Sequence, residues 1–396
     1  MAPLGDSLRR LRDRVFPRDD TQQQQADHAL PPLPPCPVSA VTSSPAPGAT
    51  AHSPLFQRLP AEIRERILVA AFGDQLVHMH LSLERPLRHH RARRGGEGSS
   101  TRVGHAGHPG QAAFDPATPP FWRWRSTRCH SSCFDHGSWR RRAPRRSDAF
   151  RDRDPCVSGE SCGHPGAPGT CVLGATGWLG TCRRAYQEGY PVLYGTNTVR
   201  LHGTFMFAHL PELLPAPSLE SLTRVSLCWD LGWLRSYPRR LRPGDHPEEY
   251  SFVEGLDKLL VRLPFTLPHV KCLHISLQGV FGDGEQWAVY GARSPVVYEQ
   301  TEALLRRVLV HILPLRTLTE FRLALPRSMF MPWVQEVLNI TLEFDEAIWA
   351  ELPAEWLKRD VPTDLLHSDE NMAVMDSFWV LLGVSDLPPL TIRCFY

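Results

Sequence analysis

The alternation of hydrophobic and polar positions becomes regular near residue 60, where it predicts a helix over residues 60–72. Pro60 suits the first turn, because the N–H group that proline lacks would be unbonded there, and Gly73 is a natural stop. The apolar residues of this segment recur at helical spacing and form one predicted buried stripe, made of Ile63, Ile67, Ala71, Leu68 and Phe72. The next apolar run, residues 76–81, predicts a strand.

A second amphipathic helix is predicted far downstream, over residues 178–190. Its predicted buried face consists of Leu179, Cys182, Tyr186, Val192 and Leu193. Tyr186, Tyr190 and Tyr194 recur every four residues, a spacing that we interpret as core packing in preference to a binding stripe. A strand follows over 196–201. We expect the two predicted helices to contact one another, which would make the residues between them an insertion within one domain.

Beyond residue 201 the pattern alternates between helix and strand. Helices are predicted over 205–214, 249–263 and 298–313, and strands over 222–228, 270–277 and 318–325. This order favours an α/β fold, with α+β as the alternative, built on a mixed or mostly parallel sheet. The last two strand-to-strand intervals are both near 48 residues, as in a leucine-rich array, but without a shared consensus we predict no repeat. Residues 340–344 look strand-like, and the apolar residues 378–382 are expected to pack on the body.

Composition divides the chain into four predicted parts. Hydrophobic residues make up 42%, while the 37 prolines and 28 glycines together exceed the globular norm. We therefore predict a disordered leader over 1–52, an F-box-like helix and strand over 53–83, a largely disordered insertion rich in arginine, glycine and proline over 84–170, and an α/β body over 171–396 that completes the same domain. Within the insertion, the aromatic patch 121–124 is expected to dock on the body.

Charge and targeting signals narrow the function classes. Residues 85–153 hold 16 arginines against 5 acids, yet only three of the 44 basic residues in the chain are lysines. We attribute the arginine excess to a chain-wide bias and do not predict nucleic-acid binding. No stretch approaches the roughly 20 apolar residues of a membrane span. Without a secretory signal, the ten cysteines are expected to be reduced thiols in an intracellular protein, with nucleus or cytoplasm left open.

Candidate chemistry is sparse. Residues 159–163 match the Gly-x-Ser-x-Gly pattern of hydrolases, but their flanks form neither strand nor helix, so no nucleophile is predicted. His78 and His80 share one face of a predicted strand and are expected to be solvated or hydrogen-bonded. We predict no cofactor and no metal site. The zinc candidates that we keep as an alternative are Cys129, Cys133, Cys156, Cys162, His164 and Cys171.

Two separated segments carry a family resemblance. The first is Ser53-Pro54-Leu55-Phe56 followed by Leu59-Pro60-x-Glu62-Ile63-Arg64, and the second runs from Cys182-Arg183-Arg184-Ala185-Tyr186 through Glu188-Gly189 to Thr196-Asn197-Thr198. Together they resemble an uncharacterised family of filamentous-fungal proteins that carry a domain of unknown function. The first segment is also similar to the first helix of an F-box. That similarity implies docking on a Skp1-type adaptor of a ubiquitin ligase through Leu59, Pro60, Ile63, Ile67 and Leu68.

These observations favour a non-catalytic protein-interaction module over an enzyme. An F-box-like chain would serve as a substrate adaptor of a ubiquitin ligase, with another protein as its partner and no small-molecule substrate. The alternative is a structural or regulatory domain that does not bind Skp1, with a zinc-stapled insertion as one version of it. The two hypotheses differ in the adaptor that they require and in the metal content that they predict.

Overall fold

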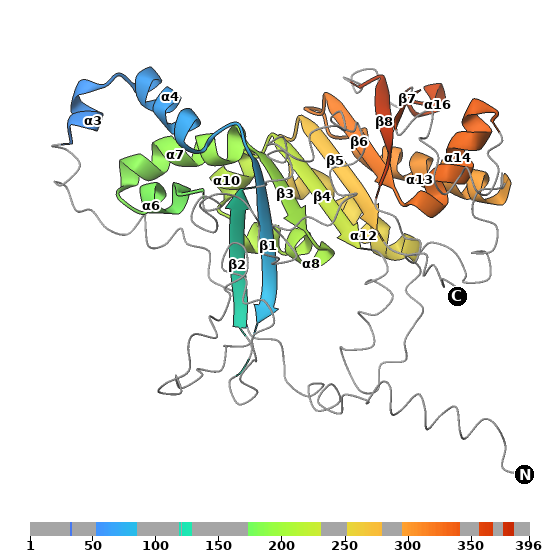
Figure 1. Ribbon diagram of the computed structural model, residues 1–396, viewed down its shortest axis with the longest axis horizontal. Coiled ribbons are helices and arrows are strands. Elements are labelled where there is room, and N and C mark those ends of the chain that lie inside the picture. The colour runs from blue at the N-terminus through green and yellow to red at the C-terminus, as the bar shows by residue number, and fades with distance from the viewer. Residues whose placement is uncertain are drawn as a thin grey trace, which may run out of the picture.

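The computed structural model describes residues 32–33, 53–84, 119, 121–128, 173–230, 252–278, 295–340, 356–366 and 375–383. An eight-stranded sheet runs through these residues (Figure 1). Its strands, in spatial order, are β2 (Phe121–Arg128), β1 (Leu76–Glu84), β3 (Thr198–His202), β4 (Arg224–Asp230), β5 (Cys272–Gln278), β6 (Glu320–Leu325), β8 (Ser377–Leu382) and β7 (Trp356–Asp360). The six central strands are parallel, and β2 and β7 pair antiparallel at the two ends.

The crossover helices cover one face of this sheet. They are α8 (Thr204–Ala208), α9 (Leu210–Leu213), α10 (Ala216–Glu220), α12 (Phe252–Thr266), α13 (Pro295–Ile312) and α14 (Arg327–Leu338), and the short α16 (Thr363–Leu366) joins β7 to β8. Because successive parallel strands are neighbours and such crossovers share one hand, these helices fall on the same side. Alternate strand residues on that side, such as Val225, Leu227 and Leu273, belong to the main apolar core.

A separate group of helices lies beside the β1 end of the sheet (Figure 1). It consists of α3 (Pro54–Arg58), α4 (Ala61–Phe72), α6 (Ala175–Leu179) and α7 (Arg183–Gly195), and we call it the helical cap. The expected contact between the first predicted helix and the second is present, because α4 packs against α7. Segments on either side of the predicted insertion therefore build one packed unit.

Most elements beyond residue 200 agree with the sequence-based expectations. The α/β class and the mostly parallel sheet are confirmed, and residues 378–382 pack on the body within β8. The second predicted helix is divided into α6 and α7, because Cys182 is extended and caps α7 through its thiol. The helix α14 and the strand β7 were not predicted.

The predicted insertion contains an ordered strand. Residues 121–128 of the insertion, which was predicted to be largely disordered apart from its aromatic patch, form β2, and Trp122 stacks on Phe205 of α8 with ring centroids 4.6 Å apart. The aromatic patch thus docks on the body as expected. Most of the leader, all but residues 32–33, lies outside the described residues, as do most of the insertion and residues 341–344 of the strand-like piece.

The predicted buried stripe of the first helix is wrong by one position. Leu68 and Phe72 are buried, but Ile63 and Ile67 are 40% and 44% exposed, and the third buried residue of α4 is Arg64. An arginine at a buried position requires a partner that compensates its charge. That partner determines how the helix is oriented.

Candidate functional site

An ion pair orients α4 on the helical cap. The guanidinium of Arg64 donates from Nε to Glu188 Oε2 at 2.7 Å and from Nη2 to Glu188 Oε1 at 2.6 Å, and it also donates to the Leu59 carbonyl. Arg64 is 5% exposed and Glu188 is 24% exposed. The hydrogen bonds from Arg64 hold the pKa of the Glu188 carboxyl below its usual value. This bidentate geometry fixes the rotation of α4 about its own axis.

Aromatic contacts extend the ion pair toward α3. The Phe56 ring lies 5.7 Å from the guanidinium carbon of Arg64 and 5.1 Å from that of Arg184, and its centroid is 5.8 Å from Trp178. Arg184 also donates to Glu188 at 3.0 Å. Phe56 is therefore held between two cations and an indole, a geometry that favours cation–π attraction.

A glycine permits the close approach of α6 to α7. A Cβ atom on Gly189 would lie 2.8 Å from Leu179 Cδ2 and 2.9 Å from Trp178 Cδ1, which is closer than real side chains come. The Glu188-Gly189 pair in the second sequence motif thus has two structural roles. Glu188 binds Arg64, and Gly189 makes room for Trp178.

Buried polar contacts tie the end of α4 to the sheet. The side-chain amide of Asn197, which is fully buried, donates to the carbonyls of Phe72 and Leu193, both at 2.8 Å, and its oxygen accepts from the backbone N–H of Gln75 at 2.7 Å. The apolar core of the cap lies beside them and consists of Leu68, Phe72, Ala175, Val192 and Leu193. Asn197, the asparagine of the second motif, therefore links α4, α7 and the start of β1 by hydrogen bonds.

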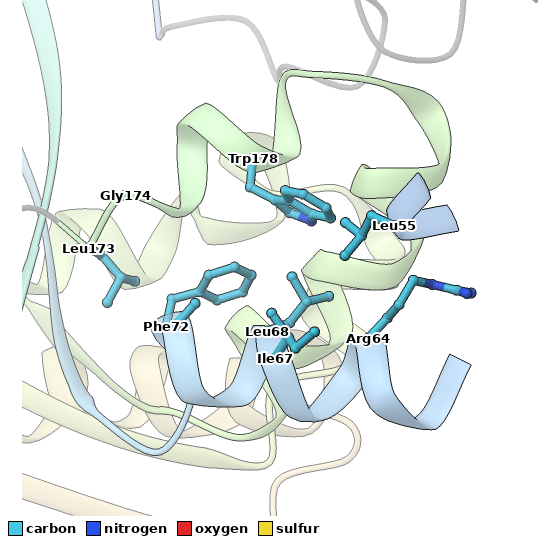
Figure 2. A pocket seen from close by; sticks show the side chains of 9 residues that line it. Leu55, Arg64, Ile67, Leu68, Phe72, Leu173, Gly174 and Trp178 are labelled. Carbon is cyan, nitrogen blue, oxygen red and sulfur yellow. The ribbon is translucent and has the colours of Figure 1, made fainter. Parts of the chain in front are cut away.

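An apolar groove of about 240 Å³ opens between α4, α3 and α6 (Figure 2). Its lining, which defines what we call the α4 groove, is Leu55, Arg64, Ile67, Leu68, Ala71, Phe72, Leu173, Gly174 and Trp178. Figure 2 shows Trp178 and Leu55 facing Leu68 and Phe72, while the guanidinium of Arg64 points away from them. Arg64 is the single charged residue of this lining, and Glu188 already binds it. The groove offers apolar contact surface, with no nucleophile among its lining residues.

Ile63 and Ile67 continue this apolar surface along the outside of α4. With Ala71 they follow one another at four-residue spacing, which places them on one line of the helix. All three are exposed, and Ile67 also lines the α4 groove. We call Ile63, Ile67 and Ala71 the outward stripe.

The five residues implied by the F-box similarity have different surroundings. Pro60, Ile63 and Ile67 are exposed, and Leu59 is half-buried. Leu68 is 4% exposed and belongs to the core of the cap, so its side chain is committed to folding. Ile67 is exposed and Leu68 is buried because of the rotation of α4. That rotation is held by the ion pair between Arg64 and Glu188, which lie 124 positions apart in the chain.

The other candidate sites give little chemistry. All six zinc candidates lie outside the described residues, and within the described part no cluster of three or more histidine, cysteine or acidic residues could hold a metal ion. His78 is 2% exposed, and its Nδ1 lies 3.1 Å from His202 Nε2. Burial raises the pKa of the Cys272 thiol, which disfavours the reactive thiolate.

Comparison with known proteins identifies one domain model. Residues 170–252 match a domain of unknown function (DUF7730), a region that begins just before α6 and ends at the start of α12. The second motif lies inside this match and the first motif lies outside it. No curated protein and no solved structure matches the chain. Among the described residues, no helix is both long and apolar enough to cross a membrane.

Proposed function

We propose that this chain is a non-catalytic protein-interaction module that binds a protein partner through the outward stripe and the α4 groove. The observation that carries the proposal is the exposure of Ile63 and Ile67 on a helix that an ion pair holds in place. Exposed apolar residues that adjoin an apolar groove are typical of protein-binding surfaces.

The energetic cost of this arrangement supports a role in binding. Each isoleucine left about half exposed forgoes on the order of 1 kcal/mol of hydrophobic stabilisation. Here Arg64 occupies the inward position and is compensated by Glu188, so the apolar surface that remains is available to a partner.

The partner that we propose first is a Skp1-type adaptor, which would make the chain an F-box-like substrate adaptor of a ubiquitin ligase. The segment from Leu59 to Ile67 resembles the first helix of an F-box, and its isoleucines point outward, as docking requires. Among the described residues, Cys182 and Cys272 are free thiols, which fits the reducing intracellular setting of such a ligase.

A binding titration of the full chain against a purified Skp1-type adaptor tests this proposal. We expect association that is lost in the double variant Ile63→Asp/Ile67→Asp, because two carboxylates would be desolvated in the interface. The matched control is Val261→Asp/Val310→Asp, which places the same charges at positions of α12 and α13 that are 52% and 50% exposed. Absent association, or equal binding by both double variants, would remove the adaptor hypothesis.

One observation favours a second candidate, a structural or regulatory domain that does not bind Skp1. The strand β1 follows α4 directly, where an F-box would continue with another helix. In this case the outward stripe would serve a different protein. Metal analysis of the purified chain tests whether zinc binds in the insertion. A zinc content far below one equivalent per chain would rule out the zinc staple.

A further inference from the structure

Three consecutive units of the sheet repeat with a period of 48 residues. The strands β4, β5 and β6 begin at Arg224, Cys272 and Glu320, which are register partners across the sheet. Apolar residues recur at five positions of each unit and are all at most 8% exposed: Leu219, Leu267 and Leu315; Leu222, Val270 and Leu318; Val225, Leu273 and Phe321; Leu227, Ile275 and Leu323; Trp229, Leu277 and Leu325.

Backbone hydrogen bonds recur at the same positions. The N–H of Leu222 donates to Leu219 at 3.1 Å, and the equivalent bonds of Val270 and Leu318 measure 3.4 and 2.9 Å. The carbonyl of Thr223 accepts from Lys271 and Cys272, and the carbonyl of Lys271 accepts from Thr319 and Glu320. The three units therefore share one turn and one strand geometry, which is the definition of a repeat array.

The face of the sheet opposite the crossover helices differs between the units. We call it the helix-free face, since the described crossover helices lie on the other side of the sheet. At equivalent positions of β4, β5 and β6 it carries buried Ser226, half-buried His274 and exposed Arg322, which lie side by side in register. The row continues through Trp379 of β8 to Lys358 of β7. Positions that build the core keep their apolar character in every unit, whereas positions on this face change their chemistry.

Three exposed bases stand against two acids on the described part of the helix-free face. Arg224, Arg322 and Lys358 are exposed, and His274 and Trp379 are half-buried between them. Among the described side chains of this face the acids are Glu320, which accepts from Arg322 at 2.7 Å, and Asp360. Of the other described bases on this face, Arg200 and His78 are buried, whereas His80, His202 and His274 are half-buried.

We propose that the helix-free face of this repeat array is a second binding surface, separate from the α4 groove, and that it takes an acidic polypeptide segment. Arg224, Arg322 and Lys358 would pair with carboxylates of the segment, and the indole of Trp379 would contact its apolar side chains. Rows of side chains that cross parallel repeats form extended surfaces suited to such segments. The chain would then hold two proteins at once, one at each surface.

The experiment is a selection from a display library of random peptides of about 15 residues, long enough to cross four strand spacings of roughly 4.8 Å. Peptides selected on the full chain should be enriched in Asp and Glu. Their affinity should fall about tenfold or more in the triple variant Arg224→Ala/Arg322→Ala/Lys358→Ala. The matched control Arg66→Ala/Arg183→Ala/Arg316→Ala removes the same charge from exposed positions elsewhere and should bind like the wild type.

Three results would overturn the proposal. They are a selection without acidic enrichment, equal affinity of the two triple variants for the selected peptides, and tighter binding of a single-stranded oligothymidine than of those peptides. The last result would identify a nucleic-acid surface instead. Because Ile63→Asp/Ile67→Asp leaves the helix-free face unchanged, its retention of peptide binding separates this proposal from the function proposed for α4.

Discussion

The helical cap and the repeat array bury their apolar residues by different rules. In the array, every apolar position of the repeated turn and strand is buried, from Leu219 to Leu325. In the cap, the neighbours Ile67 and Leu68 are 44% and 4% exposed, although both are aliphatic and lie on one helix. In the array the apolar positions of the turn and strand follow the local pattern of burial, whereas a charged pair orients α4 in the cap and leaves Ile63 and Ile67 outside. Surface left in this way is available for binding.

The largest expected effect is on the buried side of α4. Replacing Leu68 by Asp should cost about 4 kcal/mol or more, because a carboxylate would enter the core of the cap without a partner. Urea denaturation followed by circular dichroism measures this cost. The control Ala70→Asp, at an exposed position of the same helix, should unfold close to the wild type. A wild-type midpoint for Leu68→Asp would contradict the observed packing.

The repeat array predicts equal losses at equivalent leucines. Leu219→Ala, Leu267→Ala and Leu315→Ala should each destabilise the chain by roughly 2–5 kcal/mol, since each removes a side chain that is nearly or fully buried in the same turn. Denaturant unfolding of the three variants measures the losses side by side. A loss at one position with neutral effects at the other two would break the repeat equivalence.

The ion pair of the cap predicts a smaller loss that depends on pH. The pKa of Glu188 is lowered in the folded chain, so the pair stabilises the fold above the usual value of 4.5, and this stabilisation is lost as the pH falls below it. Glu188→Gln should lower the unfolding midpoint near neutral pH and flatten its decline in acid. The matched control is Glu62→Gln, at an exposed position of α4. A variant with the acid profile of the wild type would refute this role.

The smallest expected effect is on the outer surface of the array. Phe265 of α12 is 81% exposed. Phe265→Ser should therefore change the free energy of unfolding by no more than about 0.5 kcal/mol. Differential scanning calorimetry can resolve this difference. A larger loss of unfolding free energy would mean that exposed apolar residues of the array also stabilise the fold. The contrast with the cap would then be weaker.

The sequence predicts the array better than the cap, for a physical reason. Strand and crossover periodicity is a local property, and most predicted elements beyond residue 200 are therefore present. The orientation of α4 depends on a remote carboxylate, Glu188, which no helical periodicity reports. Helical periodicity alone places Ile63 and Ile67 on the buried side of α4. That prediction is wrong here, because Arg64 occupies the buried side and is paired with Glu188.

The 48-residue spacing was noted in the sequence but not assigned to a repeat, because its core positions exchange one apolar residue for another. Val225, Leu273 and Phe321 occupy one site of the repeat but share no residue identity. The repeated bonds become visible only when the strands are aligned by register. The strand β2 was foreseen only as a docking aromatic patch, since its alternation of aromatic residues with arginine lies within a segment of low periodicity.

The equilibrium unfolding of Ile63→Asp/Ile67→Asp tests most directly whether the outward stripe contributes to the stability of the fold. Our account predicts a denaturation midpoint within error of the wild type, because both carboxylates would remain in water. A midpoint lowered as far as that of Leu68→Asp would contradict it, since the stripe would then belong to the core and would not be available to a partner.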